Sequence, residues 1–185
     1  MSDRCPRTAD GTFRLTLGLP TGLTTTATGV GSYVTKQLYT AYGEPTVTTR
    51  KTAGGEYVED ATYYDLTTRR ITHNSIKAES ATGTMSDRNY RYDDIGNITS
   101  IADLPELGSA DTQCFRYDAL RRLASAWTPR ADVSCETAPS AANLGGPAAY
   151  WQDWTYDEIG NRRQEVDHTA SGTTTRTYAV PTPRG

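Results

Sequence analysis

Four aspartates that follow a tyrosine directly are the first candidates for chemistry in this chain. They are Asp65, Asp93, Asp118 and Asp157. Carboxylates serve elsewhere as general acids or bases and as metal ligands. Four equivalent catalytic acids in one chain would be unusual, whereas an Asp at the first position of a turn accepts hydrogen bonds from the backbone two residues on. The pattern therefore favours turn capping, with a metal or ligand contact as the alternative.

The remaining groups that can react or bind metal are sparse. His73 and His168 stand alone in separate repeats, and the chain has neither a C-x-x-C nor an H-x-x-x-H pattern. No glycine-rich segment matches a phosphate-binding loop. We predict no catalytic residue, no metal and no cofactor, so the chain is not expected to be an enzyme. An enzyme would need a pocket that places one of these histidines beside an Asp or a Cys.

Aromatic residues cluster at Tyr150-Trp151-Gln152-Asp153-Trp154. In a strand, Trp154 and Tyr156 share one face and Trp151 points to the other. A tryptophan beside Tyr and Asp can stack on a sugar, which makes Trp151 and Trp154 candidate ligand-stacking residues. The alternative, which we favour, is aromatic packing beneath a neighbouring loop.

Two of the three cysteines, Cys114 and Cys135, have a spacing that suits a disulfide. Such a bond would close a loop of about 20 residues and contribute roughly 3 kcal/mol in the chain-entropy model. It would imply an oxidising compartment. The alternative is two unrelated thiols in a reducing cytosol, and Cys5 is left unpaired in either case.

A hexapeptide recurs in the sequence, and its copies contain the Tyr-Asp pairs described above. Tyr92-Asp93-Asp94-Ile95-Gly96-Asn97 and Tyr156-Asp157-Glu158-Ile159-Gly160-Asn161 both read Y-D-(D/E)-I-G-N. Looser copies begin at Tyr39, Tyr64 and Tyr117. A unit that recurs every few tens of residues is typical of a repeat architecture.

Each copy has the chemistry of a tight turn between two strands. Tyr90 and Tyr92 lie on one face of the strand before the turn, and Gly96 tolerates the positive φ that such turns need. Gly160 and Gly43 have the same role, while Asn97 and Asn161 end the two full hexapeptides. Thr68 and Arg121 are predicted to replace the glycine in the other copies, at a cost of about 1 kcal/mol or with a changed geometry.

The hairpins predicted along the chain form an antiparallel all-β sheet. Residues 1–30 are expected to be a mobile segment or a degenerate half-repeat, with alternation over 12–17 and a turn over 18–22. The repeat sheet spans 31–180, a loop rich in Pro and Gly is inserted at 128–149, and 181–185 form a tail. The predicted strand regions are 31–42 with 46–52, 57–64 with 69–76, the hairpins 88–102, 112–127 and 150–168, and an edge strand at 173–180.

These repeats resemble the RHS/YD repeats of bacterial Rhs polymorphic toxins, of the B and C subunits of insecticidal toxin complexes, and of animal teneurins. The resemblance covers roughly residues 33–180 and extends to the aromatic strands at Phe115-Arg116-Tyr117 and Trp154-Thr155-Tyr156. It implies hairpins stacked into one long, spiralling sheet that curls into a hollow shell. It implies only structural roles for the five anchor tyrosines, as packing residues, and for the Asp and Gly residues of the turns, as turn formers.

The resemblance implies a function as part of a β-shell that encapsulates or presents an attached toxin or effector domain. The self-cleaving module of the family's toxins carries a D-P-x-G-type motif, and this chain has no Asp-Pro dipeptide. The alternative is a cell-surface module that binds carbohydrate or protein through exposed Tyr and Trp. The partners expected are the rest of a shell or an attached effector domain. The open sheet edges are expected either to cause self-association or to be protected by the tails of the chain.

Composition limits the remaining classes. The net charge is −3, from 19 basic and 22 acidic residues, so the chain has no basic field suited to nucleic acid. The sequence has no apolar run long enough for a membrane span and no apolar core of a signal peptide near Met1. We expect a secreted or cell-surface location as part of a larger protein.

Overall fold

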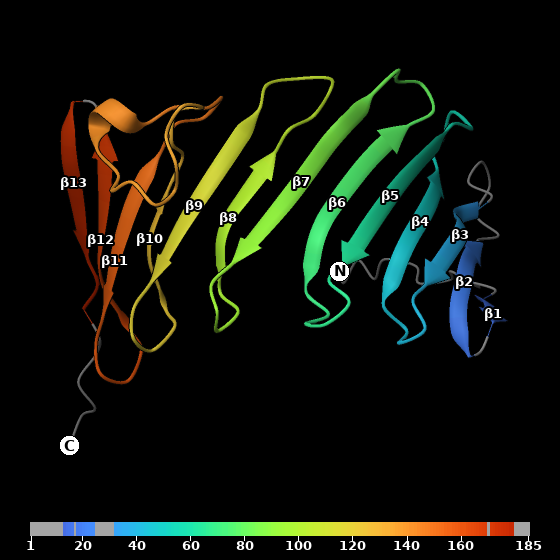
Figure 1. Cartoon of the computed structure of the whole chain (residues 1–185), viewed down its shortest axis with the longest axis horizontal. Helices are drawn as coiled ribbons and strands as arrows, with labels where there is room; N and C mark the ends of the chain where they lie inside the picture. Colours follow the sequence, from blue (N-terminus) through green and yellow to red (C-terminus); the bar gives the residue numbers. More distant parts are fainter. Residues whose placement is uncertain (1–12, 17, 25–31, 170, 180–185) are drawn as a thin grey trace, which may run out of the picture. The chain divides into compact units, whose positions relative to one another are not determined.

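The computed structural model describes residues 13–16, 18–24, 32–169 and 171–179. These residues form 13 strands, which follow one another in sequence order in an antiparallel sheet, and one three-residue 3₁₀ helix, η1 (Ala141–Asn143) (Figure 1). The all-β fold of antiparallel hairpins predicted from the repeats is therefore confirmed. The N-terminal residues 1–12 and the tail at 181–185 lie outside the described residues.

The chain divides into two compact units that share strand β7. Unit 1 runs to Asp87 and also includes residues 105–107, and unit 2 comprises residues 88–104 and 108–185. The strands of unit 1 are β1 (Phe13–Thr16), β2 (Leu19–Thr24), β3 (Ser32–Tyr39), β4 (Pro45–Lys51), β5 (Tyr57–Tyr64), β6 (Ile71–Ala78) and the first part of β7 (Thr84–Tyr92). Unit 2 continues with β8 (Ile98–Asp103), β9 (Asp111–Tyr117), β10 (Leu123–Trp127), β11 (Trp151–Tyr156), β12 (Arg162–Thr169) and β13 (Gly172–Thr177).

Threonine and other β-formers fill the strands of unit 1, as strand propensity favours. In the β3–β4 hairpin Gln37 lies opposite Thr48, and the ladder shifts by one residue next to Tyr39. The same shift occurs beside Tyr64 in the β5–β6 hairpin. A bulge at this point re-aims the last residue of the first strand, so each tyrosine occupies an equivalent place in its hairpin.

The turn predicted over residues 18–22 was wrong. Only Gly18 lies in a turn, with φ of 81°, and β2 begins at Leu19. Gly22 and Pro20 are typical turn residues, but both lie in a strand that pairs with β1 on one side and β3 on the other. Pairing on both sides outweighed the local propensity of these residues.

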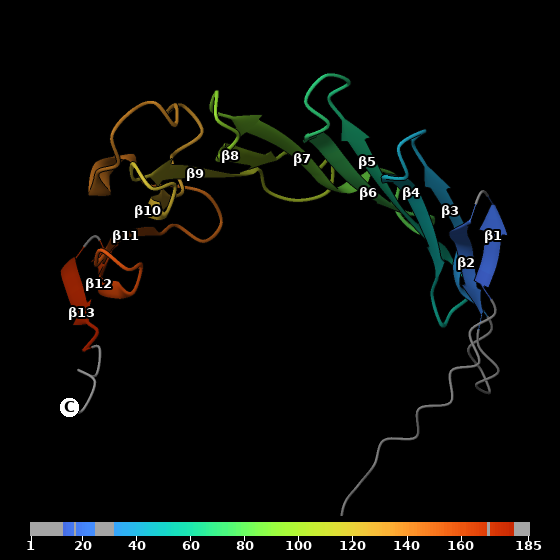
Figure 2. The same cartoon turned by 90° about the horizontal axis from the view of Figure 1, so that it is seen from below.

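The best-buried part of unit 2 lies where β9, β10 and β11 meet. Trp127 and Cys114 face one another across β9 and β10 and are 1% and 0% exposed. On its other side, Trp127 is paired with Trp151. The loop at 128–149 stands off the sheet beside these strands (Figure 2). The insertion is closed at its base by the Pro129–Leu144 bridge and by hydrogen bonds between Thr128 and Tyr150.

No helix in the described ranges is long and apolar enough to cross a membrane.

Candidate functional site: the row of Tyr-Asp turns

The two full hexapeptides form turns with the same backbone hydrogen bonds. The amide of Asp93 donates to the carbonyl of Asn97 over 3.0 Å, and the amide of Gly96 donates back to the carbonyl of Asp93 over 3.1 Å. Asp157 and Gly160 make the same two bonds at the same lengths. The looser copies at 40–44 and 118–122 share this pattern. The repeated sequence therefore specifies one repeated backbone shape.

A left-handed residue ends each turn. Gly43, Gly96 and Gly160 have φ of 86°, 98° and 93°. Arg121 takes this place in the fourth turn with φ of 61°. In the remaining turn the left-handed residue is Arg69, with φ of 60°, so the role predicted for Thr68 was wrong. The physical reason is one extra residue, because here the amide of Asp65 pairs with the carbonyl of Arg70, five residues on.

The carboxylate of each turn aspartate is used within its own turn. In the first full hexapeptide, Asp93 Oδ1 accepts from the Asn97 amide and Oδ2 accepts from the Asn97 side chain, both over 2.8 Å. Asp157 and Asn161 repeat this pair of bonds over 2.8 and 3.0 Å. The sequence marked both asparagines as repeat residues but gave them no role. Their role is to close the turn from the opposite side.

The looser turns replace this Asp–Asn pair with equivalent chemistry. Asp118 Oδ2 accepts from the Arg122 guanidinium over 2.6 Å, so an arginine takes the place of asparagine. In the first turn Thr40 Oγ1 accepts from the amides of Tyr42 and Glu44, so a hydroxyl takes the place of the carboxylate. In the longer turn Asp65 Oδ1 accepts from the Thr68 amide over 2.6 Å.

These bonds lower the pKa of the turn carboxylates. The backbone amide of Thr68 lowers the pKa of Asp65, the backbone amide of Arg122 that of Asp118, and the Asn161 side chain that of Asp157. Burial acts to raise the pKa of Asp93, but the bonds from Asn97 and neighbouring amides outweigh it and the net shift is downward. A general acid at neutral pH needs the opposite shift, so these groups are suited to capping.

The anchor tyrosines join neighbouring hairpins through what we call the inter-hairpin bond. This is a hydrogen bond from the tyrosine hydroxyl to a backbone carbonyl at the start of the second strand of the preceding hairpin, at the first residue of that strand in three cases and at the second residue, Pro20, in β2. It is formed by Tyr39 with Pro20 over 2.5 Å, Tyr64 with Pro45 over 2.9 Å, Tyr117 with Ile98 over 2.9 Å, and Tyr156 with Leu123 over 2.8 Å. Tyr92 also has an interaction partner.

The inter-hairpin bond was not foreseen, although the sequence held a signal for it. The acceptor lies 19 residues before Tyr39, Tyr64 and Tyr117, at a constant offset set by the repeat. For Tyr156 the separation is 33 residues, because the inserted loop lies between the two hairpins. Burial raises the pKa of Tyr64 and Tyr117, which keeps both hydroxyls protonated as donors.

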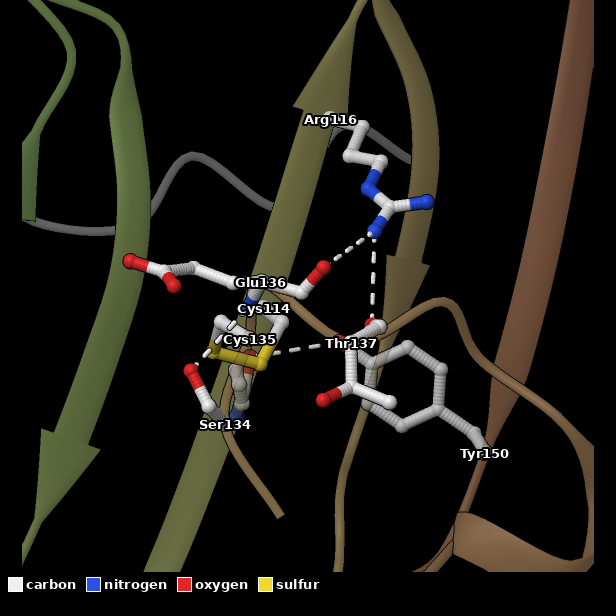
Figure 3. Close-up of a disulfide and its surroundings, with 8 residues drawn as sticks. Cys114, Arg116, Ser134, Cys135, Glu136, Thr137 and Tyr150 are labelled. Carbon is white, nitrogen blue, oxygen red and sulfur yellow. Dashed lines mark hydrogen bonds between the residues drawn. A yellow bond between two sulfur atoms is a disulfide. The ribbon is translucent and has the colours of Figure 1, made fainter.

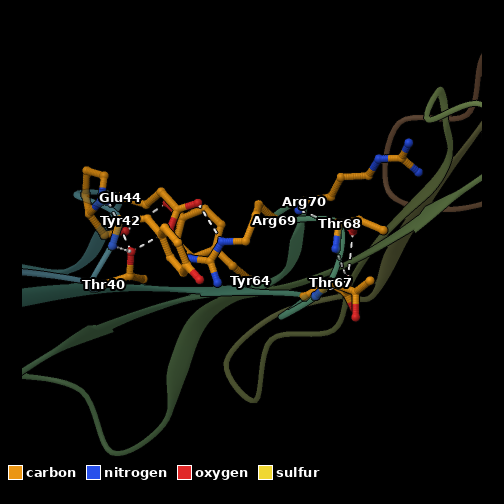
Figure 4. A network of polar contacts seen from close by, with 10 residues as sticks. Thr40, Tyr42, Glu44, Tyr64, Thr67, Thr68, Arg69 and Arg70 are labelled. Carbon is orange, nitrogen blue, oxygen red and sulfur yellow. Dashed lines mark hydrogen bonds and ion pairs between the residues drawn. The ribbon is translucent and has the colours of Figure 1, made fainter.

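Arginines connect the turns laterally within each unit. In unit 1 the guanidinium of Arg69 binds the carboxylate of Glu44 and lies 4.4 Å from the centroid of the Tyr42 ring (Figure 4). This contact lowers the pKa of Glu44 and raises that of Arg69. In unit 2 Arg122 donates to the carbonyl of Asp157 over 2.8 Å and lies over the Tyr156 ring. In each unit, an arginine thus joins one pair of neighbouring turns.

Cys114 and Cys135 are joined by a disulfide, with their Cα atoms 5.3 Å apart (Figure 3). Beside it, Arg116 donates to the carbonyls of Glu136 and Thr137 and lies over the Trp127 ring. The disulfide and this arginine together hold residues 134–137 of the inserted loop against β9. Arg116 had no predicted role.

The two candidate stacking residues are engaged inside the protein. Trp151 lies parallel to the His168 ring at 3.7 Å between centroids, and its indole N–H donates to Asp153. The N–H of Trp154 donates to Glu165, and Arg162 lies over its ring. This geometry fits aromatic packing and leaves the indole N–H groups occupied.

The two histidines lie in separate units, each beside an Asp and an aromatic ring. His168 contacts Asp153 over 2.8 Å, and His73 pairs with Asp87 and stacks on Tyr63. The described residues hold no group of three or more His, Cys, Asp or Glu side chains that suits a metal ion. The site that repeats through the chain is therefore the row of turns.

Comparison with known proteins gave matches among solved structures. No protein-family model matches the chain, and no curated protein matches it. The structure of TcdB2–TccC3 with Cdc42 is similar, with a TM-score of 0.64 and 21% sequence identity over 86% of this chain. The structure of TcdB2–TccC3 and the one without its hypervariable C-terminal region each give a TM-score of 0.64, at 21% and 20% identity.

The chain spans 8% of the length of the chains that it matches. At this identity the likeness concerns the fold. The resemblance to toxin-complex subunits drawn from the repeated hexapeptides is confirmed at that level. The chain therefore has the fold of a segment of the TcdB2–TccC3 structures, and in this chain the fold consists of antiparallel hairpins that follow one another in sequence order.

Proposed function

We propose that this chain forms part of the wall of an RHS-type β-shell that encloses or presents an attached effector domain. The observation that carries the proposal is the row of turns itself. The carboxylates of Asp93 and Asp157 are used to close their own turns, and the hydroxyls of Tyr117 and Tyr156 are used to join hairpins. The carboxylates and hydroxyls are thus engaged in closing turns and joining hairpins, which supports a structural role in a wall.

The likeness to the TcdB2–TccC3 structures supports this role because it covers most of the chain but a small fraction of the larger one. A repeat segment of this kind is stabilised mainly by its neighbours. We propose no catalytic activity for the segment, and its partners would be further shell hairpins and the enclosed domain. The Cys114–Cys135 disulfide fits an extracellular or cell-surface location.

The test is electron cryomicroscopy of the protein purified from cells that produce it. The proposal expects residues 13–177 within the wall of a closed particle that contains additional density. An open sheet exposed to solvent on both faces, with no enclosed density, would contradict the shell role.

Carbohydrate binding through Trp151 and Trp154 is the weaker candidate. The stacking of Trp151 on His168 and the bond from Trp154 to Glu165 favour a packing role for both rings.

A further inference from the structure

The turns of unit 2 each present one large apolar side chain to solvent. Ile95, Leu120 and Ile159 are 54%, 66% and 84% exposed, and each lies immediately before the left-handed residue of its turn. The two turns of unit 1 also expose an apolar residue, Tyr42 and Leu66. An apolar residue at the tip of every turn is a property of the repeat.

The turn itself does not require an apolar residue at this position. The amides of Leu120 and Ile159 are held by Asp118 Oδ1 and Asp157 Oδ1, while the side chains point away from the hairpin. A polar residue would leave these backbone bonds intact and would be better hydrated. Apolar side chains gain free energy when another surface covers them, and a row of them marks an interaction surface.

The three tips of unit 2 lie along one end of the sheet. Their turns connect β7 to β8, β9 to β10 and β11 to β12, so they close the same ends of alternate strands. Neighbouring turns are separated by two strands, or about 9.5 Å. The inter-hairpin bonds of Tyr117 and Tyr156 fix the position of each turn, along the strand direction, relative to the turn before it. We call this set, residues 93–97, 118–122 and 157–161, the turn row.

Charges alternate along the turn row. Asp94 precedes Ile95, Arg121 follows Leu120, and Glu158 precedes Ile159, and all three charged residues are exposed. None of the three has an ion-pair partner among the residues that the structure describes. A shallow hollow lies beside the last tip, lined by Tyr156, Asp157, Glu158, Ile159 and Arg163.

We propose that the turn row binds the turn row of a second copy of this chain about a two-fold axis. The axis passes between the turns at 118–122 and 157–161. Leu120 of each copy enters the hollow beside Ile159 of the other, and Arg121 of each copy faces Glu158 of the other. A two-fold arrangement makes both contacts twice, and the acidic–basic–acidic order of the row matches opposite charges at this offset.

The interface is small, so the association is weak. Two turns from each copy bury much less than the roughly 1,600 Å² of a standard stable interface. The monomer is therefore the main species at low concentration, and the concentration series that tests for the dimer needs to reach about 1 mM, the Kd of a weak association. The inference rests on the turn tips and is independent of the shell role.

The test is sedimentation velocity on residues 1–185 with the disulfide intact, at increasing concentration. The variants Arg121→Glu and Glu158→Arg each place like charges in contact, so each is expected to weaken dimerisation at least tenfold. The double variant R121E/E158R exchanges the charges and is expected to restore it to within about threefold. Both residues are exposed, and far-UV circular dichroism checks that the sheet is retained.

Thr175→Lys on β13 provides the matched control. The substitution places a charge on the open sheet edge, which disfavours pairing there with another chain, and it lies outside the turn row. The proposal expects this variant to dimerise as the parent chain does. Loss of association in Thr175→Lys but not in the turn variants would assign the contact to the sheet edge and overturn the proposal. A monomer throughout the series, or no rescue in the charge-exchanged double variant, would also overturn it.

Discussion

At the scale of single residues, the tyrosine of each repeat has two tasks that one side chain can combine. Its ring packs at the end of the strand, and its hydroxyl satisfies a carbonyl of the preceding hairpin. A phenylalanine would perform the first task only. The tyrosine hydroxyl, more than the ring, therefore accounts for the recurrence of Tyr before Asp in the sequence.

Tyr117→Phe is expected to destabilise the chain by about 1 kcal/mol, because it leaves the carbonyl of Ile98 without its donor. Tyr90→Phe is the control, since Tyr90 lies in the strand before the preceding turn and is not an anchor residue. We expect it to stay within about 0.5 kcal/mol of the parent. Urea unfolding measures both. Equal effects of the two substitutions would show that the inter-hairpin bond adds nothing to stability.

The left-handed residue of each turn allows a reciprocal pair of substitutions. Gly160→Ala adds a Cβ that meets nothing within 4 Å, so its cost of about 1 kcal/mol comes from the backbone alone. Arg121→Gly relieves a positive φ and is expected to stabilise by up to about 1 kcal/mol. Thermal unfolding at low concentration, where the chain is monomeric, reads out both. Destabilisation by both substitutions would contradict this account of the turn.

The turn carboxylates make stability depend on pH in a defined direction. Asp65, Asp93, Asp118 and Asp157 have a lower pKa in the folded state than the ordinary value of about 4. Their contribution is therefore complete above that value and is lost as pH falls below it, when the folded carboxylates take up protons. We expect the urea midpoint to fall steeply between about pH 4 and pH 2.

Asp157→Asn tests the origin of this acid sensitivity. The substitution removes the charge that the Asn161 side chain and amide bind. It is expected to lower stability at pH 7 and to make the fall below pH 4 shallower than in the parent. If the urea midpoint of the variant falls below pH 4 as steeply as that of the parent, carboxylates other than Asp157 are responsible.

At the scale of elements, the repeated sequence determines where the hairpins begin and end. The inserted loop is held by other contacts, the disulfide and the hydrogen bonds of Arg116. Strand positions from β3 to β13 lie close to those predicted, because an anchor tyrosine precedes each of the five turns and two of these turns carry the full Tyr-Asp-x-x-Gly pattern. The extra residue that moves the left-handed position from Thr68 to Arg69 was missed, because Thr-Thr-Arg-Arg gives no glycine to mark it. The inter-hairpin bond was missed because its acceptors are backbone carbonyls, so that the constant offset of 19 residues marks them in the sequence and no residue type does.

Reduction of the Cys114–Cys135 disulfide is expected to release residues 134–137 from β9. The bond closes a segment of 21 residues in sequence, so its loss is expected to cost about 3 kcal/mol in the chain-entropy model. Trypsin should then cleave at Arg130 faster in Cys135→Ser than in the parent chain without reductant. Equal cleavage rates would mean that Arg116 and the base of the loop suffice to hold it.

At the scale of the whole molecule, hairpins within each unit are completed by the hairpin that follows them. The hydroxyls of four anchor tyrosines bond backwards along the sequence, to the hairpin made before their own; these are Tyr39, Tyr64, Tyr117 and Tyr156. Stability in such an array is a sum of repeat and neighbour terms. A chain built in this way is suited to extend a wall one hairpin at a time, which agrees with the proposed shell role.

The most direct test of this arrangement is residue-resolved hydrogen exchange on the parent chain and on Tyr156→Phe. We expect protection to fall about fivefold at the preceding turn, residues 118–123, because the carbonyl of Leu123 loses its donor. Amides of the variant's own turn, residues 157–161, should keep their protection. Loss confined to residues 157–161, with residues 118–123 unchanged, would contradict the claim that each tyrosine secures the hairpin before it.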